Sequence, residues 1–475
     1  MRTRRHLELD ILEHDRIATF RARNREEDPP SEESMAVGAH LSKKATGAKD
    51  TRALTKQRAA ASSPLSRRTT QGLLASRRSH GLAARLTRSA VSSGKEGSVT
   101  EMDQGDAETP PQYRTVQASV VSVSDLQAET LSEATLEQIR DALGKDGLGI
   151  VALRGVEGLA GAREALLPLA DALANLNQDQ LGELEDEESS YSIGWSHGKE
   201  TLEGGIPDIF KGSFYANPIH DVLDVTDEER KKYPSYTRPN IWPHDAIPGL
   251  RPALMRMGGL IVDHGKLLAR ACDTLTRREL GLGGGDDLGP SSIEGAIEDS
   301  FAAKARLLHY FPPTVDAESP SSSGQDEGKM GNWCGWHLDH GSLTGLTGAM
   351  FTDCAGGQVE NPDPEKCGLY IKSRQGEIVR VTYAKDCIAY QVGEVSEIMS
   401  NGVLKATPHC VVGAEGEKAK GIARNTFAVF MQPKWDLALE VAEDKAGKGG
   451  VETKGYRPGI SFGDFTQVKL DEYYS

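Results

Sequence analysis

The sequence predicts a mainly β protein with an α/β segment in front of its strands, and three observations support this prediction. First, the strand-like run VQASVVSVSDL is followed by a helix that Ser132 can cap and by a second apolar run, LGIVALRGV. Second, helical patterning continues over residues 162–176 and in a long amphipathic stretch at 251–280, which the GLGGG run ends. Third, short strand-like runs recur in the C-terminal half, such as KATPHCVV beyond Asn401-Gly402, a dipeptide typical of hairpin turns.

Composition limits the partners of the chain. It has 475 residues, a formal charge of -15 and a pI near 5.4, which argues against nucleic acid because phosphate binding needs a basic face. No run approaches about 18 apolar residues, so a membrane helix is not expected. Six cysteines without CxxC pairs suit free thiols and disfavour zinc. We therefore expect a monomer that binds a small molecule.

The first 111 residues lack apolar periodicity, so we expect a disordered tail. Residues 35–99 are rich in Lys and Arg and poor in acids, which is the composition of a transit peptide, whereas the first thirty-four residues are acidic. The protein is thus expected in the cytoplasm or, if the basic segment is a transit peptide, in a plastid or mitochondrion. The alternative is that this segment is only a tail.

A histidine and a carboxylate lie two residues apart in the run NWCGWHLDHGSLTGLT. In a β-strand His337 and Asp339 would point to one face, with Trp336 and Leu338 packing on the other. His409, in the KATPHCVV run, is the candidate third ligand. Two histidines and one carboxylate suit iron(II) and leave positions open for a co-substrate and oxygen. The alternative is that the HxD pair lies solvated on a surface strand.

A guanidinium and a hydroxyl follow in the run ARNTFAVFMQP, where Arg424 and Thr426 share one strand face. This pair suits one end of a dicarboxylic acid, because the guanidinium fork holds a carboxylate through two parallel hydrogen bonds. The alternative is a surface salt bridge.

The segment from about residue 304 to 436 resembles the isopenicillin N synthase-like family of iron(II)/2-oxoglutarate-dependent oxygenases. HLDHGSLTGL is similar to its HxDxGxLTxL block and RNTFAVFMQP to its RxS block, with Thr426 in place of Ser. Five blocks occur in the family's order: RLLHYFPP (306–313), HLDHGSLTGL (337–346), GLYIKSRQGEIVRV (368–381), YQVGEVSEIMSNGVLKATPHCVV (390–412) and RNTFAVFMQP (424–433). NIWP (240–243) and YRPGISFGDF (456–465) also resemble family segments.

The resemblance implies a double-stranded β-helix, or jelly-roll, with outer helices and an α/β N-terminal module. It implies residues 112–300 as the N-terminal region, 301–437 as the oxygenase domain and 438–475 as a C-terminal extension. Iron(II) would be bound by His337, Asp339 and His409. The co-substrate 2-oxoglutarate would meet Arg424, Thr426 and Tyr310. With O2, such an enzyme hydroxylates a small organic molecule and releases succinate and CO2.

Two rival functions remain open at this point. One is an iron oxidase of the same fold that does not use 2-oxoglutarate, and the other is a catalytically silent jelly-roll that serves as a binding module. The acidic run at 178–190 is expected to be an exposed loop, and polar loops are expected at 316–331 and 352–366. His197, His220, His244 and His264 have no partners at ligand spacing, so we expect them to be structural or solvated.

Overall fold

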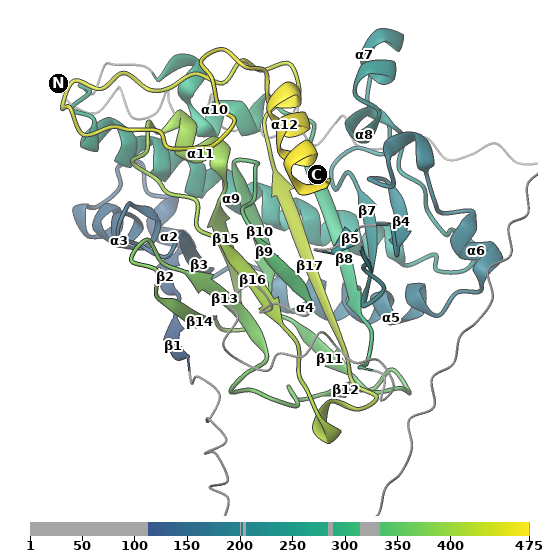
Figure 1. The fold of residues 1–475 in the computed structure, drawn as a ribbon. Helices are drawn as coiled ribbons and strands as arrows, with labels where there is room; N and C mark the ends of the chain where they lie inside the picture. Colours follow the sequence, from purple (N-terminus) through teal and green to yellow (C-terminus); the bar gives the residue numbers. More distant parts are fainter. Residues whose placement is uncertain (1–112, 200, 203–205, 284–287, 314–332, 475) are drawn as a thin grey trace, which may run out of the picture. The chain divides into compact units, whose positions relative to one another are not determined.

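Two β-sheets that pack against each other form the core of the folded part of the chain (Figure 1). The computed structural model describes residues 113–199, 201–202, 206–283, 288–313 and 333–474. The predicted tail at 1–111 and the whole of the predicted polar loop at 316–331 therefore lie outside the described residues. The larger sheet has ten strands and the smaller has five. The fold is thus mainly β, with the two-sheet core expected of a jelly-roll.

The larger sheet runs in the order β2-β3-β15-β10-β17-β8-β7-β4, with β11 and β12 attached beside β17. Its strands are β2 (Ser119–Ser122), β3 (Ile150–Arg154), β4 (Gly194–His197), β7 (Lys211–Ala216), β8 (Lys304–Tyr310), β10 (Leu343–Thr347), β11 (Met350–Thr352), β12 (Gln358–Val359), β15 (Cys387–Val392) and β17 (Ala423–Met431).

The smaller sheet runs in the order β1-β14-β13-β16-β9. Its strands are β1 (Arg114–Gln117), β9 (Cys334–His337), β13 (Gly368–Lys372), β14 (Ile378–Thr382) and β16 (His409–Val412). β13 and β14 form the antiparallel hairpin that the GLYIKSRQGEIVRV block predicts. A short separate hairpin joins β5 (Thr201–Leu202) to β6 (Ile206–Pro207).

The helices of the described residues are α2 (Val123–Leu126), α3 (Glu133–Leu143), α4 (Leu159–Leu166), α5 (Pro168–Ala174), α6 (Gln178–Gly182), α7 (Asp227–Lys232), α8 (Pro234–Thr237), α9 (Leu250–Glu279), α10 (Ile293–Glu298), α11 (Glu394–Met399) and α12 (Phe462–Tyr474). Of these, α3 packs against β2 and β3, and α9 packs against β10 and β17 (Figure 1). Phe462 and Tyr456 of the C-terminal segment pack into the main core, as predicted.

The long helix α9 lies against β10 and β17, which confirms the amphipathic helix predicted at 251–280. The Tyr390 hydroxyl donates to the Ile261 carbonyl at 2.7 Å and ties the sheet to the helix. A side chain at Gly345 would clash with Ile261, so the absence of a side chain permits this close approach. Helix α9 thereby supports strands β10 and β17 from the outer side of the larger sheet.

The first strands of the described chain extend the two core sheets. β1 pairs in parallel with β14 of the smaller sheet, whereas β2 pairs in parallel with β3 of the larger one. Ser132 caps α3, since its hydroxyl accepts from the Thr135 amide at 3.1 Å, and the helix ends at Gly144. The predicted strand, capped helix and strand are thus present, but the first run divides into two strands in different sheets.

Two helical predictions were wrong in detail. The helix predicted at 162–176 is two helices, α4 and α5, because Pro168 begins the second. The acidic run at 178–190 is no exposed loop: it contains α6 and a 3-10 turn at Glu187–Ser189. Asp186 is buried because its carboxylate takes two hydrogen bonds from Arg238, at 2.8 and 2.9 Å. Pairing with a cation outweighs the tendency of this acidic residue to stay in water.

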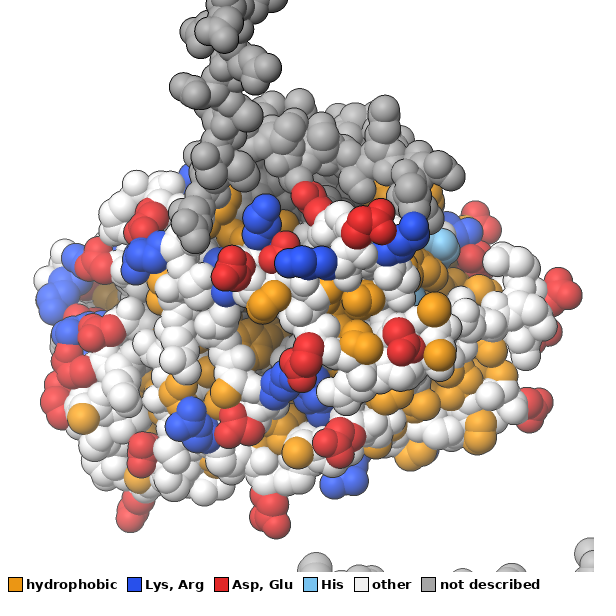
Figure 2. Space-filling view, turned by 90° about the horizontal axis from the view of Figure 1, so that it is seen from below, with side chains coloured by type: hydrophobic (Ala, Val, Ile, Leu, Met, Phe, Trp, Pro, Cys, Tyr) orange, Lys and Arg blue, Asp and Glu red, His pale blue; other side chains and the backbone are white. Residues whose placement is uncertain are grey.

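The surface of the described part carries both signs of charge. In Figure 2, Lys and Arg side chains alternate with Asp and Glu on the face shown, with apolar patches between them. None of the helices in the described residues is long and apolar enough to cross a bilayer. All six cysteines are free thiols, as the sequence predicts.

Candidate metal centre

The first candidate ligand, His337, is the last residue of β9. Its Nδ1 lies 2.8 Å from the Gly335 carbonyl, which can only accept, so Nδ1 carries the proton. When the ring is neutral its lone pair is therefore on Nε2, which lies 3.8 Å from Asp339 Oδ1. A backbone carbonyl that orients an imidazole in this way is the usual support of a metal-binding histidine.

Asp339 lies just beyond β9, so the prediction of one strand for both residues was wrong. The strand ends because the next residues turn toward α11. There the Asp339 carbonyl accepts from the Glu394 amide at 2.8 Å, and the Gly341 carbonyl accepts from the Val395 amide at 3.1 Å. A side chain at Gly393 would strike the Gly341 carbonyl. The helix start thus fixes the loop, and the loop aims the carboxylate.

His409 begins β16 and pairs directly with His337 across the smaller sheet. Its Nδ1 lies 3.2 Å from the Thr407 carbonyl, and its Nε2 lies 3.8 Å from Asp339 Oδ2. The predicted hairpin at Asn401-Gly402 was wrong, because those two residues close the C-terminal end of α11, and the Gly402 amide donates to the Glu397 carbonyl. Both residues have positive φ, which helix ends and hairpin turns share.

A buried ion pair holds the segment that leads into His409. Glu397 of α11 accepts from Lys405 Nζ at 3.1 Å and from the Ala406 amide at 3.1 Å. Arg374 adds a contact to the same carboxylate at 3.2 Å. The imidazole therefore lies on a segment anchored at several points.

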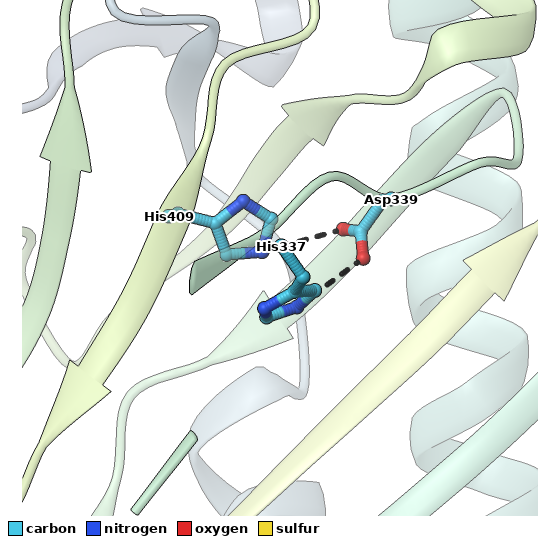
Figure 3. Close-up of side chains that lie close together, drawn as sticks. All are labelled: His337, Asp339 and His409. Carbon is cyan, nitrogen blue, oxygen red and sulfur yellow. Dashed lines mark ion pairs between the residues drawn. The ribbon is translucent and has the colours of Figure 1, made fainter. Parts of the chain in front are cut away.

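The three side chains converge on one point (Figure 3). One donor atom from each residue lies within 4.8 Å of the other two, and the two ring centroids are 4.2 Å apart. Asp339 and His409 are only 7% and 6% exposed. We refer to His337, Asp339 and His409 as the metal triad; two of its members are buried and His337 is half-buried.

The charges within the metal triad fit a cation site. Burial lowers the pKa of His409 to about 4, with a further decrease from His337, so this imidazole is neutral near pH 7. Burial alone would raise the pKa of Asp339, but the two histidines outweigh it and hold that pKa below its ordinary value. Burial likewise lowers the pKa of His337, while Cys334 and Asp339 raise it to about 9. A carboxylate and a neutral imidazole are the forms that metals bind.

One buried atom of the metal triad lacks a partner. Asp339 Oδ2 is inaccessible to solvent and has no hydrogen bond within the described part of the chain. A buried carboxylate oxygen in that state costs free energy unless something else satisfies it. His409 Nε2 lies 3.8 Å from this oxygen and His337 Nε2 lies 3.8 Å from Oδ1 of the same carboxylate. The donor set therefore fits a bound divalent metal, and two histidines with one carboxylate suit iron(II).

The second part of the site lies on the larger sheet. Arg424 and Thr426 belong to β17, and the strand register places Arg424 directly opposite Tyr310 of β8. The Arg424 guanidinium lies 5.0 Å from the Tyr310 ring centroid and 5.8 Å from that of Trp333. Its Nη1 is buried without a hydrogen-bond partner among the described residues. Among the described residues Arg424 forms no ion pair.

The sequence did not indicate Trp333 or the network behind β17. Trp333 stacks on Tyr310, with ring centroids 5.1 Å apart, and its own ring centroid lies 5.8 Å from the Arg424 guanidinium. On the opposite face of the sheet, Asn425 bonds His309 at 2.8 Å and Asp171 at 2.9 Å. No motif could have revealed these contacts, although the strand alternation of β8 and β17 places Asn425 and His309 on the face away from Arg424.

The other histidines singled out from the sequence lie apart from the metal triad. The one grouping of His, Cys, Asp or Glu side chains with metal-site spacing in the described residues is the triad itself. His197 lies near the Ile209 carbonyl at 3.0 Å, and His264 Nδ1 lies 2.8 Å from the Leu260 carbonyl. These contacts agree with a structural role for both.

The described residues thus combine a two-sheet jelly-roll core with a His-Asp-His cluster on the smaller sheet and Arg424 on the larger one. Comparison with solved structures agrees with this fold. A full-length protein of Neurospora crassa, solved in complex with alpha-KG, aligns with a TM-score of 0.54 and 18% identity, over 76% of this chain and 100% of that one. A 2OG-Fe(II) oxygenase family protein from Caulobacter crescentus aligns with a TM-score of 0.53 and 19% identity, over 75% and 98% of the two chains.

Two plant enzymes are similar in sequence. A homoarginine-6-hydroxylase of Arabidopsis thaliana, named as a 2-ODD protein, is 25% identical over 268 residues, which cover 53% of this chain and 65% of that enzyme. A homoarginine-6-hydroxylase of rice (Oryza sativa subsp. japonica) is 24% identical over 256 residues, or 53% and 63% of the two chains. The matches thus span less than two thirds of either enzyme. The chain matches no protein-family profile. The family resemblance predicted from the sequence blocks is confirmed by these relatives.

Proposed function

We propose that this protein is a non-haem iron(II)- and 2-oxoglutarate-dependent dioxygenase that hydroxylates a small organic molecule and releases succinate and CO2. One observation carries the proposal. Two buried polar atoms have no hydrogen-bond partner among the described residues: Asp339 Oδ2 in the metal triad and Arg424 Nη1. These are the two positions at which the proposed chemistry requires a bound metal and a bound carboxylate. A protein without ligands at both places would leave a buried carboxylate oxygen and a buried guanidinium nitrogen unsatisfied.

The metal triad would bind iron(II) through Nε2 of His337, Nε2 of His409 and the Asp339 carboxylate. When bound, this iron supplies oxygen activation coupled to oxidative decarboxylation of 2-oxoglutarate. The protein contributes orientation. The Gly335 and Thr407 carbonyls keep each imidazole in the tautomer that presents Nε2, and the start of α11 holds the carboxylate in place.

Arg424, Thr426 and Tyr310 would hold the distal carboxylate of 2-oxoglutarate. A guanidinium offers two parallel N–H donors to one carboxylate, and the Thr426 hydroxyl lies two residues away on the same face. Tyr310 lies beside the guanidinium, whereas the next residue, Phe311, packs against His309 at 4.7 Å and so points elsewhere. This geometry favours Tyr310 as the aromatic contact.

Two rival functions are less well supported. A silent binding module would have no use for a buried, complete His-Asp-His donor set. An oxidase independent of 2-oxoglutarate would leave the buried Nη1 of Arg424 without a role. The relatives named above as hydroxylases favour the dioxygenase as well.

The proposal is tested with protein purified without oxygen. It is loaded with iron(II) and 2-oxoglutarate, and a pulse of oxygen is then given in the presence of a metabolite panel. We expect succinate and a product heavier by one oxygen atom in equal amounts. Product without succinate supports the oxidase instead, and a failure to retain iron supports the silent module.

We further propose three features on sequence grounds. Residues 112–300 form an N-terminal α/β and helical region, 301–437 the oxygenase domain and 438–475 an extension. The protein acts as a monomer on a small molecule. Light scattering of the purified protein measures its oligomeric state. The basic segment at 35–99 directs import into an organelle, and a fluorescent fusion with and without that segment tests this.

A further inference from the structure

The last helix of the chain, α12, contacts the loop that carries Asp339. This loop, residues 338–342, connects β9 to β10. The ring of His340 stacks on the ring of Phe462, the first residue of α12, with centroids 6.1 Å apart and planes 22° from parallel. Phe462 is fully buried, so the contact belongs to the core and not to the surface. Helix α12 thus touches the residue that follows a proposed metal ligand.

A buried ion pair links α12 to the start of α11. Lys469 Nζ of α12 lies 2.7 Å from Glu394 Oε1 of α11. Lys469 is only 6% exposed and Glu394 only 3%. Removing one member of such a pair leaves the other as an uncompensated charge in the interior. The position of Glu394 therefore depends on Lys469.

Backbone contacts carry the position of Glu394 to the loop. Glu394 is the first residue of α11, and its amide donates to the Asp339 carbonyl at 2.8 Å. The Ser342 carbonyl, at the end of the loop, accepts from the Gly393 amide at 2.9 Å and from the Ser396 hydroxyl at 2.8 Å. A shift of the first turn of α11 would therefore displace the main chain of Asp339, and the carboxylate with it.

Helix α12 has supports of its own. The Tyr236 hydroxyl of α8 donates to Thr466 Oγ1 of α12 at 3.2 Å. Phe465 of α12 is fully buried, and the Lys469 ammonium lies 5.5 Å from the centroid of its ring, a distance at which cation and ring attract each other. The ammonium is thus held on an anchored helix, which makes it a fixed point for the Glu394 carboxylate.

We propose that Lys469 is a positioning residue of the metal centre, which holds the Asp339 loop in place through Glu394 and makes α12 a part of the iron site. The inference rests on the proposed function, because it takes the metal triad as the iron site. Residues that support a metal ligand affect metal affinity without touching the metal. Lys469 acts in this way through α11 and is not itself a ligand.

The test uses the full chain and two readouts. Iron(II) affinity is measured by competition with a chelator under nitrogen, and the visible spectrum of the cobalt(II)-loaded protein reports the arrangement of the ligands. Lys469→Met should weaken iron binding roughly 10- to 100-fold, as the loss of a support for a metal ligand does. It should also change the cobalt spectrum. Lys469→Arg should keep most of the affinity and the wild-type spectrum, because the positive charge is retained.

A double variant tests whether Lys469 acts through Glu394. Glu394→Gln keeps the shape of the side chain and should also weaken iron binding. In the Glu394→Gln background, Lys469→Met should cost much less affinity than in the wild type, because residues that act as a pair are not additive. Additive losses would overturn the proposal. If Lys469→Met does not fold, Glu394→Gln decides alone, and unchanged iron affinity in that variant would overturn the proposal as well.

Asp273→Asn is the control for a general loss of stability. Asp273 is a buried carboxylate of α9 that accepts from the Ser292 hydroxyl at 2.7 Å and from the Ile293 and Glu294 amides at 2.9 and 3.1 Å, at the start of α10. Its replacement should lower the thermal midpoint, as Lys469→Met does. Iron affinity and the cobalt spectrum should stay those of the wild type.

The outcomes are distinguishable. If wild-type protein binds no iron, the proposed function fails and this inference with it. If the wild type binds iron and Lys469→Met binds it equally well at a lower thermal midpoint, Lys469 has a structural role only. If Asp273→Asn loses as much iron affinity as Lys469→Met, the loss follows stability, so the positioning role is wrong while the dioxygenase assignment stands.

Discussion

Replacing Arg424 by Ala tests the link between the fold and the proposed co-substrate. The guanidinium lies beside the stacked rings of Tyr310 and Trp333, and its buried Nη1 has no hydrogen-bond partner among the described residues. Removing one member of a desolvated charge pair costs about 2–5 kcal/mol. At about 1.4 kcal/mol per tenfold, Arg424→Ala should weaken 2-oxoglutarate binding roughly 30- to several thousand-fold. An exposed ion pair would be worth only about 0–1 kcal/mol.

The assay is calorimetric titration of 2-oxoglutarate into iron-loaded protein under nitrogen. Arg424→Lys should recover only part of the loss, because a point charge replaces a planar fork. Thr426→Ala should cost about 0.5–1.5 kcal/mol, or roughly 2- to 12-fold, as one hydrogen bond is lost. Iron content should stay the same in all three variants, since neither residue belongs to the metal triad. Unchanged affinity in Arg424→Ala would refute the co-substrate role and favour the oxidase.

Four further predictions follow from the same geometry and from the sequence. His409→Ala should abolish iron retention without loss of fold. His220→Ala, at an exposed histidine, is the control. Full iron stoichiometry in His409→Ala would contradict the assignment of the metal triad. Gly345→Ala should lower the free energy of unfolding by about 1–3 kcal/mol in urea, because the added methyl group meets Ile261; an unchanged midpoint would show that α9 shifts freely. Burial lowers the pKa of Lys304 to about 7, against about 10.4 when unfolded, so its charged form is penalised most below pH 7 and progressively less toward pH 10. Lys304→Met should therefore raise the thermal midpoint at pH 6 more than at pH 10, and an equal gain at both would contradict the lowered pKa. A chain that begins at Gln112 should keep the thermal midpoint and turnover of the full length, and a large loss of either would show that the preceding residues pack on the enzyme.

Local patterns predicted much of the fold. The Ser132 cap and the long helix α9 were predicted from local patterns, because capping and helical period act over a few residues. The same reasoning failed where two structures share one local signal. Asn401-Gly402 has the positive φ values of a hairpin turn, but it follows the end of helix α11. Whether such a dipeptide forms a hairpin turn or ends a helix depends on the conformation of the residues before it.

By itself the sequence predicted the residues of the metal triad and Arg424, because HxD spacing, a later histidine and an RxT pair occur along the chain in a recognisable order. Only the tertiary structure decided which of these groups have which neighbours. The pairing of β16 with β9 brings His409 beside His337, and the pairing of β17 with β8 sets Arg424 against Tyr310. Trp333 reaches Arg424 and Tyr310 in the same way, through packing between distant segments. Some of these pairings join residues more than one hundred positions apart in the sequence. No local sequence pattern predicts them, because strand register is set by the burial of whole strand faces.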